Sequence, residues 1–197
     1  MAAPDWLAAV EPDAPDVVAV WRLIETDFRS TRRQLRQRAG PGSAERVLAQ
    51  QEAVADALAA ALDGISDEML RAPGGEEDWN VAQTFAHTTG ARRWLARAGA
   101  WAARGVWPSD SPVVVPGVPG APHADRETLL TLLAKSRRSM AESASAIAGH
   151  ESDPCPLKHP LIGKLRCGEW LLWAGVHDLM HVEQLHRLRT GGADAAR

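Results

Sequence analysis

The C-terminal part of the chain carries the pattern that constrains the fold most. Between Glu169 and Arg189, apolar positions recur every three or four residues, which is the period of an amphipathic helix. His177 and His181 stand within this inner stripe. Because they are four residues apart, their imidazoles project from one face of the helix in successive turns. Two imidazoles at this spacing can chelate one divalent metal ion, so the stretch predicts a helix that carries part of a metal site.

The rest of the chain is predicted to be helical as well. No run of β-branched and aromatic residues shows the period-2 alternation of a strand, and breaks rich in Gly and Pro separate segments with helical periodicity. The predicted helices span residues 16–38, 44–62, 81–104, 126–148 and 169–189. We therefore expect an all-α fold in which the last four helices form a bundle.

Two regions are expected to differ in their role. Residues 41–197 contain the four helices of the bundle, and residues 1–40 form an N-terminal extension with one helix. That helix has its own apolar stripe, which includes Val17 and Trp21. We expect the stripe to cover either the surface of the bundle or a partner chain. In the second case the protein would be a homodimer.

The charge and the segment types exclude several classes of protein. A net charge of -3 and a pI near 6.2 argue against a general nucleic-acid-binding protein. No apolar run approaches the roughly 18 residues of a membrane span, and the N-terminus does not resemble a secretory signal. Cys155 and Cys167 do not make a disulfide framework. We expect a cytoplasmic protein with free thiols, a small-molecule substrate, and neither a nucleic-acid nor a membrane partner.

A histidine pair supplies too few ligands for a metal, and His87 on another predicted helix is the best third ligand. Neutral imidazole nitrogen suits zinc, nickel, iron or cobalt. Three protein ligands leave at least one coordination position for water or substrate, the arrangement of a catalytic site. The alternative is that each histidine is an ordinary hydrogen-bonded residue of the core or the surface.

Three more residues share the faces of these histidines. Gln184 follows the pair by one turn and could orient an imidazole. Trp94 and Trp173 could line an apolar pocket or simply fill the core. The loops over residues 105–123 and 149–168 are rich in Pro and Gly and could form the walls of a cleft above the metal.

Three neighbouring polar residues are expected to have structural roles. His159 precedes Pro160 and should form a turn rather than bind the metal. Asp178 points about 100° away from His177 and should meet a neighbouring helix. Glu169 lies in the first turn of the last helix, where its negative charge is favourable.

The order and spacing of these residues resemble the DinB-like superfamily. The resemblance rests on Trp79-Asn-Val-Ala-Gln-Thr-Phe-Ala-His87, on His159-Pro-Leu-Ile-Gly163, and on the stretch from Glu169 to Gln184. It covers about residues 44–190 and implies a four-helix bundle. It also implies a divalent metal, zinc, nickel or iron, bound by His87, His177 and His181. The helix over residues 16–38 departs from the family pattern, which does not need it.

The resemblance also implies a class of function. Members with known activity include thiol-dependent transferases and a thiol-dependent maleylpyruvate isomerase, which use mycothiol, bacillithiol or similar thiols. We therefore expect an enzyme of the thiol S-transferase type. The alternatives are a non-enzymatic metal- or ligand-binding bundle of a stress response and a metal-dependent hydrolase. No Cys, Ser or carboxylate of the sequence is clearly placed as a nucleophile, so no catalytic residue is assigned.

Overall fold

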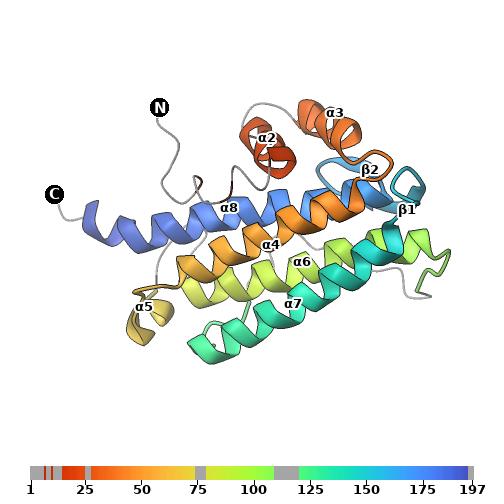
Figure 1. The fold of residues 1–197 in the computed structure, drawn as a ribbon. Helices are drawn as coiled ribbons and strands as arrows, with labels where there is room; N and C mark the ends of the chain where they lie inside the picture. The colour runs from red at the N-terminus through yellow and green to blue at the C-terminus, as the bar shows by residue number, and fades with distance from the viewer. Residues whose placement is uncertain are drawn as a thin grey trace.

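Four long helices lie side by side along most of their length (Figure 1). The computed structural model describes residues 15–24, 28–73, 79–108 and 120–194, together with positions 7 and 10. The four helices are α4 (Ala44–Ala61), α6 (Val81–Ala103), α7 (Arg126–Ile147) and α8 (Cys167–Asp194). α6 packs against both α7 and α8, and α4 packs against the same two helices from the other side. This arrangement is a four-helix bundle, which confirms the predicted all-α fold.

Local hydrogen bonds explain where two of these helices begin. Asn80 and Gln83 form a capping box, in which each side-chain oxygen accepts a hydrogen bond from the backbone N–H of the other residue, at 2.8 and 3.0 Å. The carboxylate of Asp125 accepts a hydrogen bond of 2.8 Å from the backbone N–H of Thr128. Asn and Asp are favoured at this position because their side-chain oxygens can accept from the free backbone N–H groups of the first turn.

The start of α4 is capped differently. Ser43 precedes the helix, but its side chain makes no capping hydrogen bond. The carboxylate of Glu151, on the loop after α7, accepts a hydrogen bond of 3.3 Å from the backbone N–H of Ala44. Glu151 is buried, and its negative charge lies at the positive end of the α4 dipole. A residue far along the sequence therefore provides the cap that Ser43 does not.

The single helix predicted over residues 16–38 is wrong. The structure describes two helices, α2 (Pro15–Ile24) and α3 (Phe28–Arg38), on either side of residues 25–27, which lie outside the described part. The two helices pack against each other, which the two halves of one straight helix could not do. The pattern of apolar residues did not reveal the break, because the stripe continues across it.

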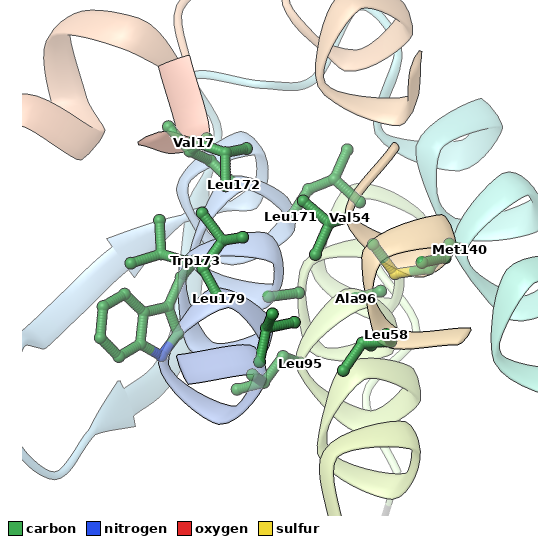
Figure 2. Close-up of a cluster of buried hydrophobic side chains, with 14 of the residues drawn as sticks. Val17, Val54, Leu58, Leu95, Ala96, Met140, Leu171, Leu172, Trp173 and Leu179 are labelled. Atoms are coloured by element: carbon green, nitrogen blue, oxygen red, sulfur yellow. The ribbon is translucent and has the colours of Figure 1, made fainter. Parts of the chain in front are cut away.

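α2 packs against α8 and α4, on the outside of the four-helix bundle (Figure 1). Val17 of α2 lies close to Leu172 of α8 and is fully buried (Figure 2). Asp16 fixes the arrangement, because its carboxylate accepts hydrogen bonds from Arg38 at 3.0 Å and from Arg46 at 2.6 Å. α2 thus contributes to the same hydrophobic core as the bundle, while the division of the chain at residue 40 stays a prediction.

Part of the loop predicted over residues 149–168 is a β-hairpin. Strand β1 (Pro154–His159) pairs antiparallel with β2 (Gly163–Arg166), and His159 lies opposite Gly163. Gly163 has φ +91°, a conformation that favours glycine. The prolines of β1 hid the strand from sequence analysis, since proline is tolerated only at the edge of a sheet. A short helix, α5 (Asp67–Arg71), was also missed.

The core fills the space between the four helices (Figure 2). Apolar side chains from every helix of the bundle meet there, and Trp170 of α8 is the largest that is fully buried. Those labelled in Figure 2 include Val54, Leu58, Leu95, Ala96, Met140, Leu171 and Leu179. None of the described helices has the length and hydrophobicity needed to cross a membrane. Packing on both sides of α6 and α8 holds these two helices, which carry the histidines, in a fixed relative position.

Candidate metal site

α8 presents His177 and His181 toward α6. Glu169 stabilises the start of the helix, because one oxygen of its carboxylate accepts a 2.9 Å hydrogen bond from the backbone N–H of Arg166. The other oxygen forms an ion pair of 3.3 Å with Arg36 of α3. The expected role of Glu169 at the helix start is confirmed. The helix then continues without a break through the histidine pair, whose ring centroids lie 4.5 Å apart.

α6 contributes His87 from its second turn. Gly120 packs directly on this part of α6: its backbone N–H donates a 3.2 Å hydrogen bond to the carbonyl of Gln83. A Cβ at Gly120 would lie 2.6 Å from the backbone nitrogen of His87, so only glycine fits. Asn80 also donates a hydrogen bond to the carbonyl of Pro122. The described end of the predicted loop 105–123 therefore lies beside the histidine, while residues 109–119 are outside the described part.

The structure brings together the three histidines that the sequence predicted as ligands. One nitrogen from each of His87, His177 and His181 lies within 4.8 Å of the other two. The ring centroid of His87 is 5.4 Å from that of His177 and 4.9 Å from that of His181. Three imidazoles at these separations can ligate one divalent cation.

The protonation pattern of the pair suits metal binding. Nδ1 of His181 donates a 2.8 Å hydrogen bond to Oε1 of Gln184, so Nε2 of the neutral ring has a free lone pair. This Nε2 lies 3.2 Å from Nε2 of His177. Two imidazole nitrogens bound to one tetrahedral zinc ion are about 3.3 Å apart, given bonds of roughly 2.0–2.1 Å. The donor set therefore fits a metal, and Gln184 is placed to orient one ligand.

The surroundings keep these imidazoles neutral. Burial, together with smaller effects of the neighbouring His87 and His159, lowers the pKa of His177 to about 3. Burial likewise lowers the pKa of His181 to about 3, with contributions from His177 and His87. A metal binds the unprotonated form of imidazole, so the low pKa values favour ligation at neutral pH.

The histidines are not sealed inside the core. All three are partly exposed, and 18% of the side-chain surface of His177 is accessible. Trp79, just before α6, covers part of the cluster: its ring centroid lies 4.9 Å from that of His87 and 6.5 Å from that of His181, nearly parallel to the latter ring. Sequence analysis included Trp79 in the family motif but did not predict its contact with the histidines.

Trp94 and Trp173, the two tryptophans predicted for the pocket, have other neighbours. The ring of Trp94 lies 5.9 Å from that of Trp170, and Nε1 of Trp173 donates a 3.2 Å hydrogen bond to Nε2 of His159. Trp173 is 3% exposed. These contacts belong to a packed aromatic cluster, and a role of either tryptophan in the pocket wall stays a prediction.

His159 closes the turn of the β-hairpin, as predicted. Its Nδ1 lies 3.3 Å from the backbone N–H groups of Leu161 and Ile162. Since a neutral imidazole has one acceptor nitrogen, it can accept either from these amides or from Trp173, not from both at once. Burial lowers the pKa of His159 to about 4, so the ring is neutral at pH 7.

Asp178 meets a neighbouring helix, as the helical geometry predicted. Its Oδ2 forms a 2.7 Å ion pair with Arg92 of α6, and both side chains are fully buried. Arg92 also donates a 2.7 Å hydrogen bond to the backbone carbonyl of Gln51 on α4. The pair thus joins three helices directly behind the histidines. Sequence analysis did not identify Arg92 as its partner.

The two cysteines are not placed as nucleophiles. Cys155 and Cys167 are buried free thiols, and burial raises the pKa of each, to about 12 for Cys167. Cys167 lies ten residues before His177 on α8, about 15 Å along the helix axis. A thiolate of this chain is therefore not available at the histidine cluster.

The fold and the site define a four-helix bundle with a three-histidine cluster between two of its helices. A model of the DinB superfamily matches residues 50–185, and the chain belongs to this superfamily. The match includes all three histidines. No curated protein and no solved structure gave a match.

Proposed function

We propose that this protein is a metal-dependent enzyme of the thiol S-transferase type, which activates a low-molecular-weight thiol such as mycothiol or bacillithiol. The observation that carries the proposal is the convergence of His87, His177 and His181, partly exposed, on one point between α6 and α8. Three protein ligands leave a coordination position for a small molecule. A bound divalent metal would supply Lewis acidity, which lowers the pKa of a thiol or a water.

The residues of the chain have distinct parts in this proposal. His87, His177 and His181 would hold the metal, and Gln184 holds the ring of His181 in the tautomer that has a free Nε2. Trp79 lies against two of the rings and is itself buried, so it would shield the metal from water on that side. Because both cysteines are buried with raised pKa values, the attacking thiol would come from solution.

The first test is the metal content of the purified protein. We expect one zinc, nickel or iron ion per chain in the wild type and a loss of that metal in His177→Ala, as measured by elemental analysis. His123→Ala is the matched control, because this histidine is exposed and lies outside the cluster. Equal, stoichiometric metal in the wild type and His177→Ala would refute the metal site.

The second test is turnover. The metal-loaded protein is incubated with mycothiol or bacillithiol and a chlorinated, epoxide or maleylpyruvate acceptor, and the product is detected by mass spectrometry. We expect a thiol adduct or an isomerised product with the wild type and with His123→Ala, but not with His177→Ala. Product formation without a thiol would favour a hydrolase. Stoichiometric metal without any turnover would favour a non-enzymatic binding protein.

A further inference from the structure

Two buried atoms behind the histidine cluster face each other without a hydrogen bond. Nδ1 of His177 and Oδ1 of Asp178 are 3.9 Å apart. Within the part of the chain that the structure describes, neither atom has a hydrogen-bond partner, although both are shielded from solvent. A buried polar atom without a partner is costly, so a pair of this kind calls for an explanation.

Arg92 determines which oxygen of Asp178 is free. Its guanidinium binds Oδ2 at 2.7 Å and is itself held by the carbonyl of Gln51. The side chain of Gln51 is fixed in turn by a 3.0 Å hydrogen bond to the carbonyl of Leu171, over the backbone of Gly175. These contacts hold the carboxylate with Oδ1 turned toward His177.

The tautomers of the two histidines explain why Oδ1 has no partner. Gln184 accepts from Nδ1–H of His181, so Nε2 of that neutral ring is an acceptor. The 3.2 Å contact between the two Nε2 atoms is then a hydrogen bond only if His177 donates from Nε2. In that tautomer Nδ1 of His177 carries no proton. It is an acceptor, like the Oδ1 of Asp178 that it faces, so the two atoms cannot form a hydrogen bond.

We propose that Asp178 is a positioning residue for the metal centre, in which its Oδ1 accepts a hydrogen bond from Nδ1–H of His177 once Nε2 of His177 binds the metal. This inference rests on the metal site of the proposed function. Ligation through Nε2 requires an unprotonated nitrogen there, and the neutral ring then carries its proton on Nδ1. The ring loses one proton from Nε2 and gains one on Nδ1, so its net protonation does not change.

The movement required is small. An N–H···O hydrogen bond is about 2.7–3.2 Å long, so a ring rotation that shortens the 3.9 Å separation by roughly 1 Å is enough. Both buried atoms then gain their missing partner in one step. A histidine ligand whose second nitrogen donates to a carboxylate is held in the orientation that metal binding needs.

The tautomer of His177 can be observed directly in the wild-type protein. Long-range 15N–1H NMR spectra are recorded after metal removal with a chelator and after addition of one equivalent of zinc. We expect the proton on Nε2 of His177 in the first sample and on Nδ1 in the second. A zinc-loaded protein in which His177 keeps its proton on Nε2 would overturn the proposal. This measurement needs no variant, so it decides the question even if a variant fails to fold.

Zinc affinity gives an independent readout. In a competition with a chromophoric chelator, we expect Asp178→Asn to bind zinc about 10- to 100-fold more weakly than the wild type. Glu169→Gln is the matched control: it also replaces a buried carboxylate of α8 that pairs with an arginine, but it lies about 12 Å from His177 along the helix. It should keep the affinity of the wild type.

The outcomes separate this inference from the proposed function. Tight zinc binding by the wild type together with an equal affinity of Asp178→Asn would overturn the inference alone. An equal loss of affinity in Glu169→Gln would also overturn it, since any buried carboxylate would then have the same effect. Failure of the wild type to bind zinc would overturn both.

Discussion

Oε1 of Gln184 lies 2.8 Å from Nδ1 of His181, and this contact decides which nitrogen of the ring is free for a metal. Gln184 is buried on the same face of α8 as the histidine, so its amide is not free to turn toward solvent. The contact gives a direct way to weaken the proposed metal site without removing a ligand.

We expect Gln184→Leu to reduce zinc affinity by about 10- to 100-fold while the protein stays folded. The leucine fills a similar volume but cannot accept the hydrogen bond that fixes the tautomer of His181. Chelator competition measures the affinity, and circular dichroism reports the helices. Gln34→Leu in α3 is the control, because the amide of Gln34 accepts a hydrogen bond from Arg38 on the same helix and Gln34 is not one of the residues of the histidine cluster. Unchanged affinity in Gln184→Leu would contradict the role of Gln184.

Trp79 should report on metal binding more strongly than any other tryptophan. Its ring is in contact with two of the three histidines, so a quenching ion such as Co²⁺ or Ni²⁺ would lie close to it. We expect the metal to quench the fluorescence of the wild type and to have a much smaller effect on Trp79→Phe. Trp101→Phe is the control, because Trp101 packs against Trp107 instead. Equal quenching in both variants would place the metal elsewhere.

The stability of the protein without metal should fall as the pH is lowered below about 6.5. The pKa values of His177 and His181 in the folded protein are about 3, below the ordinary value of 6.5. Between these values the unfolded chain binds protons that the folded chain excludes, so the free energy of unfolding decreases with decreasing pH. Each histidine adds a slope of up to about 1.4 kcal/mol per pH unit. Urea unfolding at pH 7 and pH 5 measures the effect.

A double variant tests the origin of this pH dependence. His177→Gln/His181→Gln removes the two histidines with the lowest pKa values and leaves His159 in place, so its free energy of unfolding should vary less between pH 7 and pH 5 than that of the wild type. His150→Gln is the control, since His150 is exposed on the loop after α7. The same slope in the double variant and the wild type would show that other groups bind the protons.

Arg92→Met should destabilise the protein by about 3–5 kcal/mol, because it leaves the buried carboxylate of Asp178 without its cation. The double variant Arg92→Met/Asp178→Leu removes both charges and should recover much of the lost free energy of unfolding. Urea unfolding of the wild type, Arg92→Met, Asp178→Leu and the double variant forms a double-mutant cycle. If the double variant were less stable than Arg92→Met, an unpaired charge would not be the cause.

Deletion of residues 1–40 should leave a helical, metal-binding bundle that self-associates. α2 covers apolar side chains of α8, among them Leu172, and these would become exposed. Light scattering after size-exclusion chromatography measures the association, and circular dichroism measures the helix content. A truncated chain without helical signal would show that the division at residue 40 is wrong.

The elements that local sequence determines were predicted closely. The four bundle helices follow from apolar periodicity, and the starts of α6 and α7 follow from short-range caps, Asn80 with Gln83 and Asp125 with Thr128. The helical spacing of His177 and His181 likewise fixed their common face. These features depend on residues no more than four positions apart, so the sequence alone contains the information.

The features that were missed depend on contacts between distant parts of the chain. Glu151 caps α4 from the far side of α7, and Arg92 pairs with Asp178 across two helices. Trp79 reaches His181 only because α6 and α8 are packed together. The same holds for the break between α2 and α3, where continuous apolar periodicity concealed a change of direction. No local pattern distinguishes these partners from other residues of the same type.

The cap on α4 has a consequence for the order in which the protein is made. The backbone N–H of Ala44 depends on a carboxylate that is synthesised 107 residues later, and His87 meets its two partner histidines later still. An emerging chain that ends before Glu151 therefore lacks both the cap of α4 and the complete histidine cluster. Both depend on residues from Glu151 onward, so the three histidines can converge only after α8 has been synthesised.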